Sequence, residues 1–122
     1  MKKSICIEKI FLEYDFYDRF AKVAEAGFQY VEFGYWLGRD IDRIKAECEK
    51  HHLTVTTFSA DFKASLIVPS DRAEFLDYVA KSIETAKVLG CQNLVIHSQA
   101  MDDKGQFTHD GSDLSDPVKL YS

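Results

Sequence analysis

The sequence predicts an α/β fold in which parallel strands alternate with helices, in about four strand–helix units. Short apolar or β-branched segments alternate with segments whose apolar residues recur at helical spacing. Residues 26–31 and 89–94 also share one pattern: a helix end, a glycine, an apolar residue, a glutamine and then a strand. Strands that alternate with helices are joined by right-handed crossovers, so we expect a parallel sheet.

The first unit begins with the short apolar run at residues 5–7, which predicts a strand. Asp15 then precedes a helix that it can cap, with Asp18 adding negative charge in the first turn. Gly27 fits the position just after the helix, where a positive φ is usual. The apolar positions that share one face of this helix are Phe16, Phe20, Val23 and Ala24.

The second unit pairs a strand at residues 28–33 with a helix capped by Asp40. A loop with two glycines separates them, and the helix has Ile41, Ile44 and Cys48 on its apolar face. Residues 53–58 are β-branched and aromatic, which predicts a third strand.

A longer loop at residues 60–70 leads to a third helix. Asp71 and Glu74 resemble a capping box, and Gly90 is expected to end the helix after Leu89. Its predicted apolar stripe is Phe75, Val79, Ile83 and Ala86. Residues 93–97 predict a strand covered on both faces, because the apolar core of this segment is continuous rather than alternating. A polar segment at 99–115 follows, and Ser115-Asp116-Pro117 predicts the start of a fourth helix.

Composition limits the classes of function. The chain has 122 residues, is 46% hydrophobic and has a net charge of −5, so it can bury a core and lacks the basic surface of a nucleic-acid-binding protein. The three cysteines have no spacing typical of a disulfide framework or a zinc site, and we expect small buried thiols. We find no signal peptide and no membrane span, so we expect a cytoplasmic protein.

Two architectures fit the order of elements. One is an open, doubly wound sheet, and the other is part of a (β/α)8 barrel. No G-x-G-x-x-G motif follows the first strand, as a dinucleotide-binding sheet would favour. The connections after strands 2, 3 and 4 are long and the returns from the helices are short, which suits a barrel without excluding the open sheet.

In either architecture the strand ends hold the candidate site residues. Glu32 lies inside an apolar strand, so its carboxylate must be paired or functional; the alternative is a buried Glu that joins neighbouring strands. His97 ends the fourth strand and could bind a metal or polarise a carbonyl, or be a hydrogen-bonded core histidine. Tyr35 and Trp36 could wall a small-molecule pocket or could pack within the loop.

Two segments resemble a known family. Residues 16–33, FYDRFAKVAEAGFQYVEF, are similar to the opening of hydroxypyruvate isomerases and their xylose-isomerase-like relatives. Residues 72–98, RAEFLDYVAKSIETAKVLGCQNLVIHS, are similar to the third helix and fourth strand of the same family. The resemblance implies that residues 1–122 form a partial TIM barrel domain, an N-terminal half with strands 1 to 4 and the start of helix 4.

The resemblance also implies a function. Relatives interconvert aldose and ketose forms of small sugars or hydroxy-carbonyl acids, with a divalent metal (Mg, Mn or Zn) that stabilises the enediolate. It implies that Glu32 and His97 lie near the substrate, and together with the loop position of Trp36 this predicts substrate binding by Glu32, Trp36 and His97. It implies no catalytic or metal-binding residue here, because those residues come mostly from strands 5 to 8. We therefore expect this chain to be inactive alone. The alternative is a non-catalytic half barrel that self-associates through its open sheet edges or binds a partner.

Apurinic endonucleases share the superfamily and place a zinc-ligand histidine at a similar strand end. The acidic net charge and the sequence Phe58-Ser59-Ala60, where that branch has a histidine after strand 3, favour the isomerase branch and no nucleic-acid partner.

Overall fold

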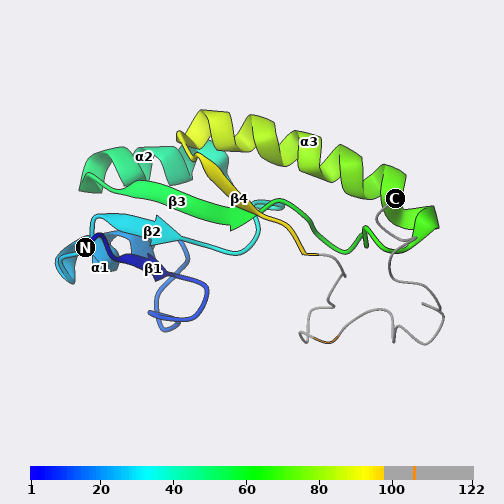
Figure 1. Ribbon diagram of the computed structural model, residues 1–122. Helices are drawn as coiled ribbons and strands as arrows, with labels where there is room; N and C mark the ends of the chain where they lie inside the picture. The colour runs from blue at the N-terminus through cyan, green and yellow to red at the C-terminus, as the bar shows by residue number, and fades with distance from the viewer. Residues whose placement is uncertain (98–105, 107–122) are drawn as a thin grey trace.

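The computed structural model describes residues 1–97 and residue 106, and these form four strands and three α-helices (Figure 1). The predicted polar segment at 99–115 and the predicted start of a fourth helix lie outside the described residues, residue 106 apart. The elements, in order, are β1 (Ser4–Cys6), α1 (Asp18–Glu25), β2 (Tyr30–Glu32), α2 (Ile41–His51), β3 (Thr54–Ser59), a 3-10 turn (Pro69–Asp71), α3 (Arg72–Leu89) and β4 (Asn93–Val95).

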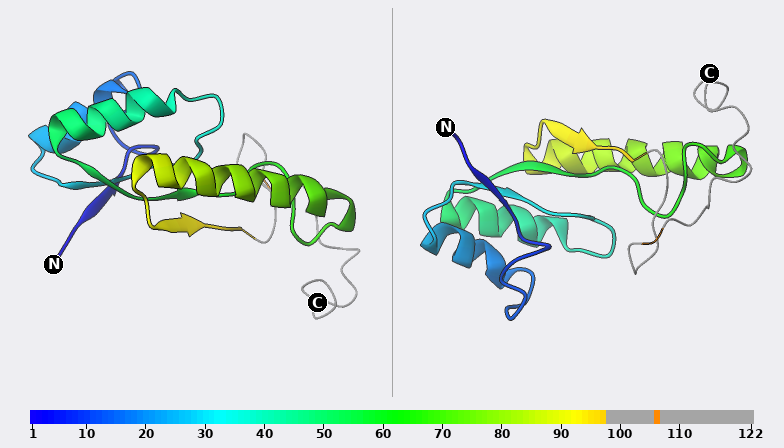
Figure 2. Two further views of the ribbon diagram at one scale, coloured as in Figure 1. Left: turned by 90° about the horizontal axis from the view of Figure 1, so that it is seen from above. Right: turned by 60° about the horizontal axis from the view of Figure 1, so that its bottom comes forward.

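The strands pair in parallel and in the order of the chain, β1-β2-β3-β4. The helices lie side by side along one face of this sheet, with α1 against α2 and α2 against α3 (Figure 2). A doubly wound sheet reverses its strand order and carries helices on both faces. Consecutive order with helices on one face is instead the arrangement of a (β/α)8 barrel, which confirms the predicted fold class and decides between the two architectures.

Each helix ends in a left-handed residue that turns the chain back into the next strand. The two predicted glycines have positive φ, Gly27 at 83° and Gly90 at 66°, and His52 takes the same role after α2 at 55°. Each turn is closed by the backbone hydrogen bond of a Schellman motif: Phe28 N to Val23 O at 3.1 Å, Leu53 N to Cys48 O at 2.8 Å, and Cys91 N to Ala86 O at 2.9 Å. The three short returns are therefore built in the same way.

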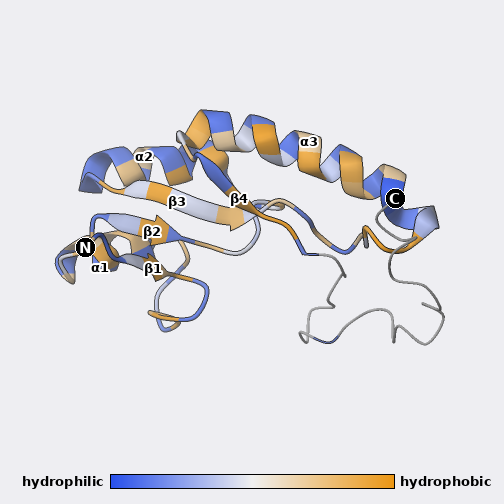
Figure 3. Cartoon of the chain, in the orientation of Figure 1, coloured by the Kyte–Doolittle hydropathy of each residue, from blue (hydrophilic) through white to orange (hydrophobic). Residues whose placement is uncertain are grey.

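The core lies between the sheet and the helices. Residues on the helix-facing side of the strands are buried, among them Val31, Val55 and Phe58, and the Phe33 and Phe58 rings stack with centroids 5.2 Å apart. Hydrophobic and hydrophilic residues alternate along α2 and α3 (Figure 3), as expected for helices with one buried side. Within residues 1–97 and 106, no helix is long and apolar enough to span a membrane.

The cysteines match the expectation of small buried thiols at two positions. Cys48 and Cys91 are buried and free, and burial raises the pKa of the Cys48 thiol to about 12. Burial also raises the pKa of Cys91. Cys6 is also free but only half-buried.

Two predicted helix caps differ in detail. Asp40 caps α2 as predicted, accepting a hydrogen bond from Arg43 N at 3.0 Å. Asp15 instead closes a turn before α1, because its carboxylate accepts from Tyr17 N at 3.2 Å and the helix begins only at Asp18. The capping box at Asp71 is wrong: no side-chain bond caps α3, and Asp71 accepts from Ser65 N at 3.2 Å within the preceding loop.

The predicted apolar stripe of α3 is partly wrong. Phe75 and Ala86 are buried, but Ile83 is 43% exposed, and the buried side of the helix includes Tyr78 and Ser82. The reason is a polar contact from another unit. The indole of Trp36 donates to Ser82 Oγ at 2.6 Å, and Ser82 donates to Ala60 O at 3.0 Å.

The fourth strand also differs from its prediction. It forms an edge of the sheet among the described residues, and only Leu94 of Asn93–Val95 packs against the core. Val95 is 41% and Ile96 53% exposed. The apolar run at 93–97 therefore has one face covered within the part that the structure describes.

Replacing Ser82 with alanine is expected to destabilise the fold by about 1–3 kcal/mol, because Ser82 is fully buried and the Trp36 indole would lose its acceptor. Chemical denaturation monitored by tryptophan fluorescence measures this directly, since Trp36 is the single tryptophan. Ser70→Ala, at an exposed site, is the control and should change stability by less than about 0.5 kcal/mol. Equal stabilities for the two variants would contradict the proposed bridge.

Candidate functional site

A hollow of about 330 Å³ lies at the carboxyl ends of the strands. In parallel α/β folds this is the end of the sheet where ligands bind. Glu32 and His97, which the sequence singled out, both line it. The full set of lining residues is Cys6, Glu8, Lys9, Glu32, Phe33, Gly34, Tyr35, Thr57, Phe58, Ser59, Val95 and His97.

Backbone hydrogen bonds continue past the strands and hold these ends together. Ile7 N donates to Glu32 O at 3.0 Å, and Ser59 N donates to Gly34 O at 2.7 Å. Ala60 N donates to Val95 O at 2.8 Å. The wall of the hollow is therefore backbone that is paired to its neighbours, which favours a fixed arrangement of its side chains.

A bulge in the pairing of β2 with β3 sets the position of Glu32. The register shifts between Val31 and Glu32, so that Glu32 pairs with Thr57 and Thr56 is the extra residue. Thr56 Oγ1 donates a hydrogen bond to Val31 O at 3.2 Å and lies 2.8 Å from Ser4 Oγ. These contacts stabilise the bulge. Bulges often re-aim side chains next to functional sites.

Glu32 is half-buried and lines the hollow between the first and third strands. Its strand neighbours are Cys6 on β1 and Thr57 on β3. Among residues 1–97 and 106, its carboxylate has no hydrogen bond or ion pair. Within that part of the chain, this half-buried carboxylate is therefore left available to a ligand.

His97 meets a partner that the sequence did not reveal. Its Nδ1 lies 3.1 Å from Oδ1 of Asp61, which follows β3. The side chain of Asp61 is only 5% exposed, whereas that of His97 is 38% exposed. The pair therefore joins a buried carboxylate to an imidazole that faces the hollow.

Glu8 is a second carboxylate of the hollow, and its charge is compensated. It forms an ion pair with Arg39 and accepts from Gly34 N at 3.1 Å. Burial acts to raise the pKa of Glu8, but the Arg39 guanidinium and the Gly34 N–H outweigh it, so the pKa lies below the ordinary 4.5. Arg39 also lies over the Phe16 ring, 3.6 Å from its centroid, which fixes the partner of Glu8.

Tyr35 and Trp36 have different places. Tyr35 lines the hollow, and its ring meets Phe62 edge-on at 4.8 Å. Trp36 is not among the lining residues; it stacks on Tyr78 at 5.1 Å and bonds Ser82 of α3. Burial raises the pKa of Tyr78 to about 12, so its phenol stays protonated. Trp36 therefore joins the loop after β2 to α3, outside the hollow.

The metal that the resemblance implies does not fit this part of the chain. No three histidine, cysteine, aspartate or glutamate side chains converge closely enough to hold an ion in the described ranges. We therefore derive no chemical step through a metal here.

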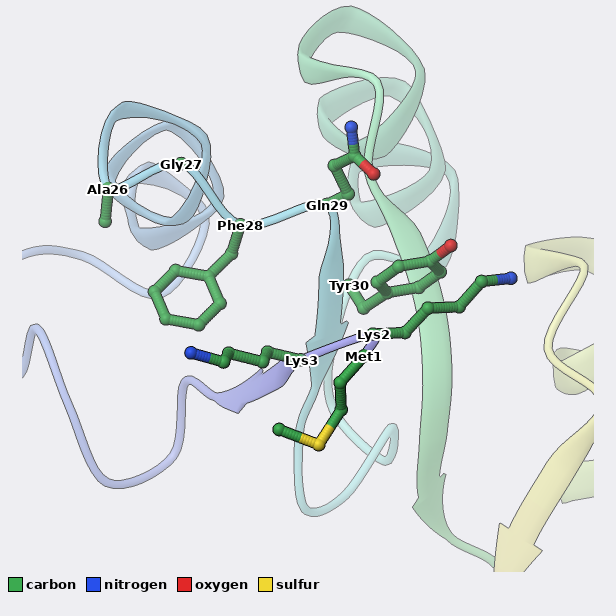
Figure 4. A pocket seen from close by; sticks show the side chains of 8 residues that line it. All are labelled: Met1, Lys2, Lys3, Ala26, Gly27, Phe28, Gln29 and Tyr30. Atoms are coloured by element: carbon green, nitrogen blue, oxygen red, sulfur yellow. The ribbon is translucent and has the colours of Figure 1, made fainter.

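A second hollow lies at the amino ends of the strands, at the opposite end of the sheet from the hollow that Glu32 and His97 line. Figure 4 shows it between the start of β1 and the turn after α1, lined by residues 1–3 and 26–30. Lys2 extends over the Tyr30 ring, 5.4 Å from its centroid. Among the described residues, the charged side chains that line it are Lys2 and Lys3, and in barrels this end contributes to stability rather than catalysis.

Two acidic residues of this region, Glu8 and Asp61, were not predicted from the sequence. Each lies two residues after the end of a strand, Glu8 after β1 and Asp61 after β3. The rule that strand carboxyl ends carry the site was the signal that could have found both. Their partners, by contrast, lie 31 and 36 residues further along the chain, as the positions of Arg39 and His97 show.

The family model of the xylose isomerase-like TIM barrel matches residues 20–115. Hydroxypyruvate isomerase of Escherichia coli is 33% identical over 97 residues, which cover 74% of this chain and 38% of that protein. The 2-oxo-tetronate isomerase of Haemophilus influenzae is 34% identical over 97 residues, 73% of this chain and 37% of that protein. The chain thus spans well under half the length of the curated relatives that it matches.

Among solved structures, an AP endonuclease of family 2 from Brucella melitensis superposes with a TM-score of 0.74 and 29% identity. The match covers 82% of this chain and 41% of that one. These likenesses agree with the strand order and the single layer of helices.

Replacing Glu8 with glutamine is expected to lower stability by about 1 kcal/mol near pH 7 and to have less effect near pH 3. A lowered pKa means that the ionised carboxylate stabilises the fold above the unfolded-state value of 4.5, and that this contribution is lost as pH falls through the lower folded-state value. Urea unfolding across that range measures the difference. Glu13→Gln, at an exposed site, is the control; a pH-independent effect of Glu8→Gln would contradict the argument.

Proposed function

Because the chain belongs to the xylose isomerase-like TIM barrel family, we propose that it supplies the first four strands of an isomerase site for a small sugar or hydroxy-carbonyl acid. One observation carries this proposal: the carboxylate of Glu32 and the imidazole of His97 line one hollow at the carboxyl ends of the strands. The names of the two curated relatives support an isomerase acting on a hydroxy-carbonyl acid.

Aldose–ketose isomerisation moves a proton between adjacent carbons while a hydroxyl and a carbonyl exchange places. The substrate must therefore be held by its oxygen atoms as charge develops on them. A carboxylate such as Glu32 accepts hydrogen bonds from hydroxyl groups, and a histidine such as His97 can donate or accept. We assign these two side chains to substrate binding, with Trp36 supporting the loop beside them.

The catalytic acid and base and a divalent metal (Mg, Mn or Zn) are proposed to come from the remaining strands of a complete barrel, as the family resemblance implies. A metal in that position would stabilise the enediolate. The 122-residue chain is then expected to be inactive alone, and to act in the cytoplasm only as part of the complete site.

The first test is turnover of hydroxypyruvate by the 122-residue chain, with Mn²⁺ or Mg²⁺ added. We expect no isomerisation above a protein-free control, because the groups that transfer the proton are proposed to lie elsewhere. Turnover that disappears on adding a chelator would overturn this expectation.

The second test supplies the further strands that this proposal assigns to a complete barrel. In a chimera, residues 1–97 replace the matching part of the E. coli hydroxypyruvate isomerase, and we expect hydroxypyruvate turnover. Glu32→Gln in this chimera should raise KM at least about tenfold, which corresponds to about 1.4 kcal/mol of lost binding. Glu13→Gln is the matched control, a Glu-to-Gln change at an exposed site outside the hollow. Equal KM values for both variants would remove Glu32 from the substrate site.

Self-association is a second candidate, favoured by the apolar surface that the described residues leave exposed. Leu76 and Ile83 on α3 are 62% and 43% exposed, and Ile96 after β4 is 53% exposed. An unpaired strand edge beside apolar side chains promotes association.

A Leu76→Lys/Ile83→Lys variant is expected to shift the chain towards monomer in sedimentation velocity, because two charges replace exposed apolar contacts. Ala46→Lys, on the exposed side of α2, controls for added charge. A wild-type chain that sediments as a monomer at all concentrations would contradict this candidate.

A further inference from the structure

Asp61 is the most deeply buried carboxylate of the described residues. It is 4% exposed, and its only direct polar partner among residues 1–97 and 106 is the His97 ring. A buried carboxylate with one partner depends on that partner, because an unpaired charge in this position is costly. The contact between Asp61 and His97 is therefore a structural part of the wall of the hollow, and not a loose contact between exposed side chains.

The chemistry of the contact decides which ring nitrogen carries the proton. An ionised carboxylate only accepts hydrogen bonds, so the nitrogen that faces Asp61 must be a donor. That nitrogen is Nδ1, at 3.1 Å. In a neutral imidazole one nitrogen donates and the other accepts, so the proton on Nδ1 leaves Nε2 as the acceptor.

The same side chain also borders the hollow. His97 lines it, its side chain is 38% exposed, and no described side chain bonds Nε2. The ring of this partly exposed side chain therefore has one nitrogen that contacts Asp61 and a second nitrogen that no described side chain bonds.

We propose that Asp61 is a positioning residue that holds His97 as the Nδ1–H tautomer, so that Nε2 accepts a hydrogen bond from a ligand hydroxyl in the hollow. This inference rests on the proposed function, which it deepens by naming the group of the substrate that His97 contacts. An acceptor there selects a hydroxyl-bearing ligand over one that presents a carbonyl oxygen to the same point.

The tautomer can be measured without any substrate. Long-range ¹H–¹⁵N NMR of the ¹⁵N-labelled 122-residue chain, at a pH where the imidazole is neutral, distinguishes a protonated Nδ1 from a protonated Nε2. His97→Gln identifies the signals, because the chain has four histidines. We expect the Nδ1–H form in the wild type. A wild-type ring in the Nε2–H form would overturn the proposal.

Asp61→Ala removes the acceptor and is expected to shift His97 towards the Nε2–H form that predominates in free imidazoles. Asp77→Ala is the control, an exposed aspartate on α3 that pairs with Lys81, and should leave the tautomer unchanged. A purely structural role for Asp61 would alter stability without this change of signal. If Asp61→Ala does not fold, the wild-type measurement still decides the proposal.

Adding hydroxypyruvate to the labelled wild-type chain separates the two proposals. A shift of the Nε2 resonance supports the contact with the ligand. An unchanged resonance, with the Nδ1–H form present, counts against hydroxypyruvate as the ligand and so against the proposed function. The positioning role of Asp61 is then still supported, because the tautomer is measured without any ligand.

Discussion

The parallel pairing of consecutive strands, with every helix on one face, is the constraint on which the structure depends. Because side chains alternate along a strand, it gives the sheet two unlike faces. On one face Val31 and Val55 pack under the helices, and on the other Glu32 and Ser59 face the hollow. The polar side chains that the sequence places within apolar strands are accommodated on the second face.

The contacts of the site also hold the strand–helix units together. Glu8 after β1 is bound by Gly34 and Arg39 from the loop after β2. Asp61 after β3 meets His97 after β4, and Ser82 of α3 links Trp36 to the end of β3. Glu8, Asp61 and Trp36 thus each obtain a partner from another unit, so a change at one of these residues is also a change in the packing between units.

What the sequence could predict follows from the range of each interaction. Asp40 and the two helix-ending glycines act within a few residues, and local patterns are sufficient to find them. The exposure of Ile83 depends on Trp36, which is distant in the chain and requires Ser82 to face it. The bulge beside Glu32 and the partner of His97 depend equally on pairing between strands. Residue types at strand ends predicted that Glu32 and His97 lie at the carboxyl ends of the strands, but not which groups meet.

The edge at β4 connects the two candidate functions. A strand added in parallel to β4 would hydrogen-bond along Asn93–Val95, and its carboxyl end would then lie next to His97 and the hollow. This holds whether the strand comes from the rest of a barrel or from a second copy of the chain. The partner of β4 would therefore complete the wall beside the Nε2 atom of His97, so the chemistry of the hollow and the covering of the edge depend on the same added strand.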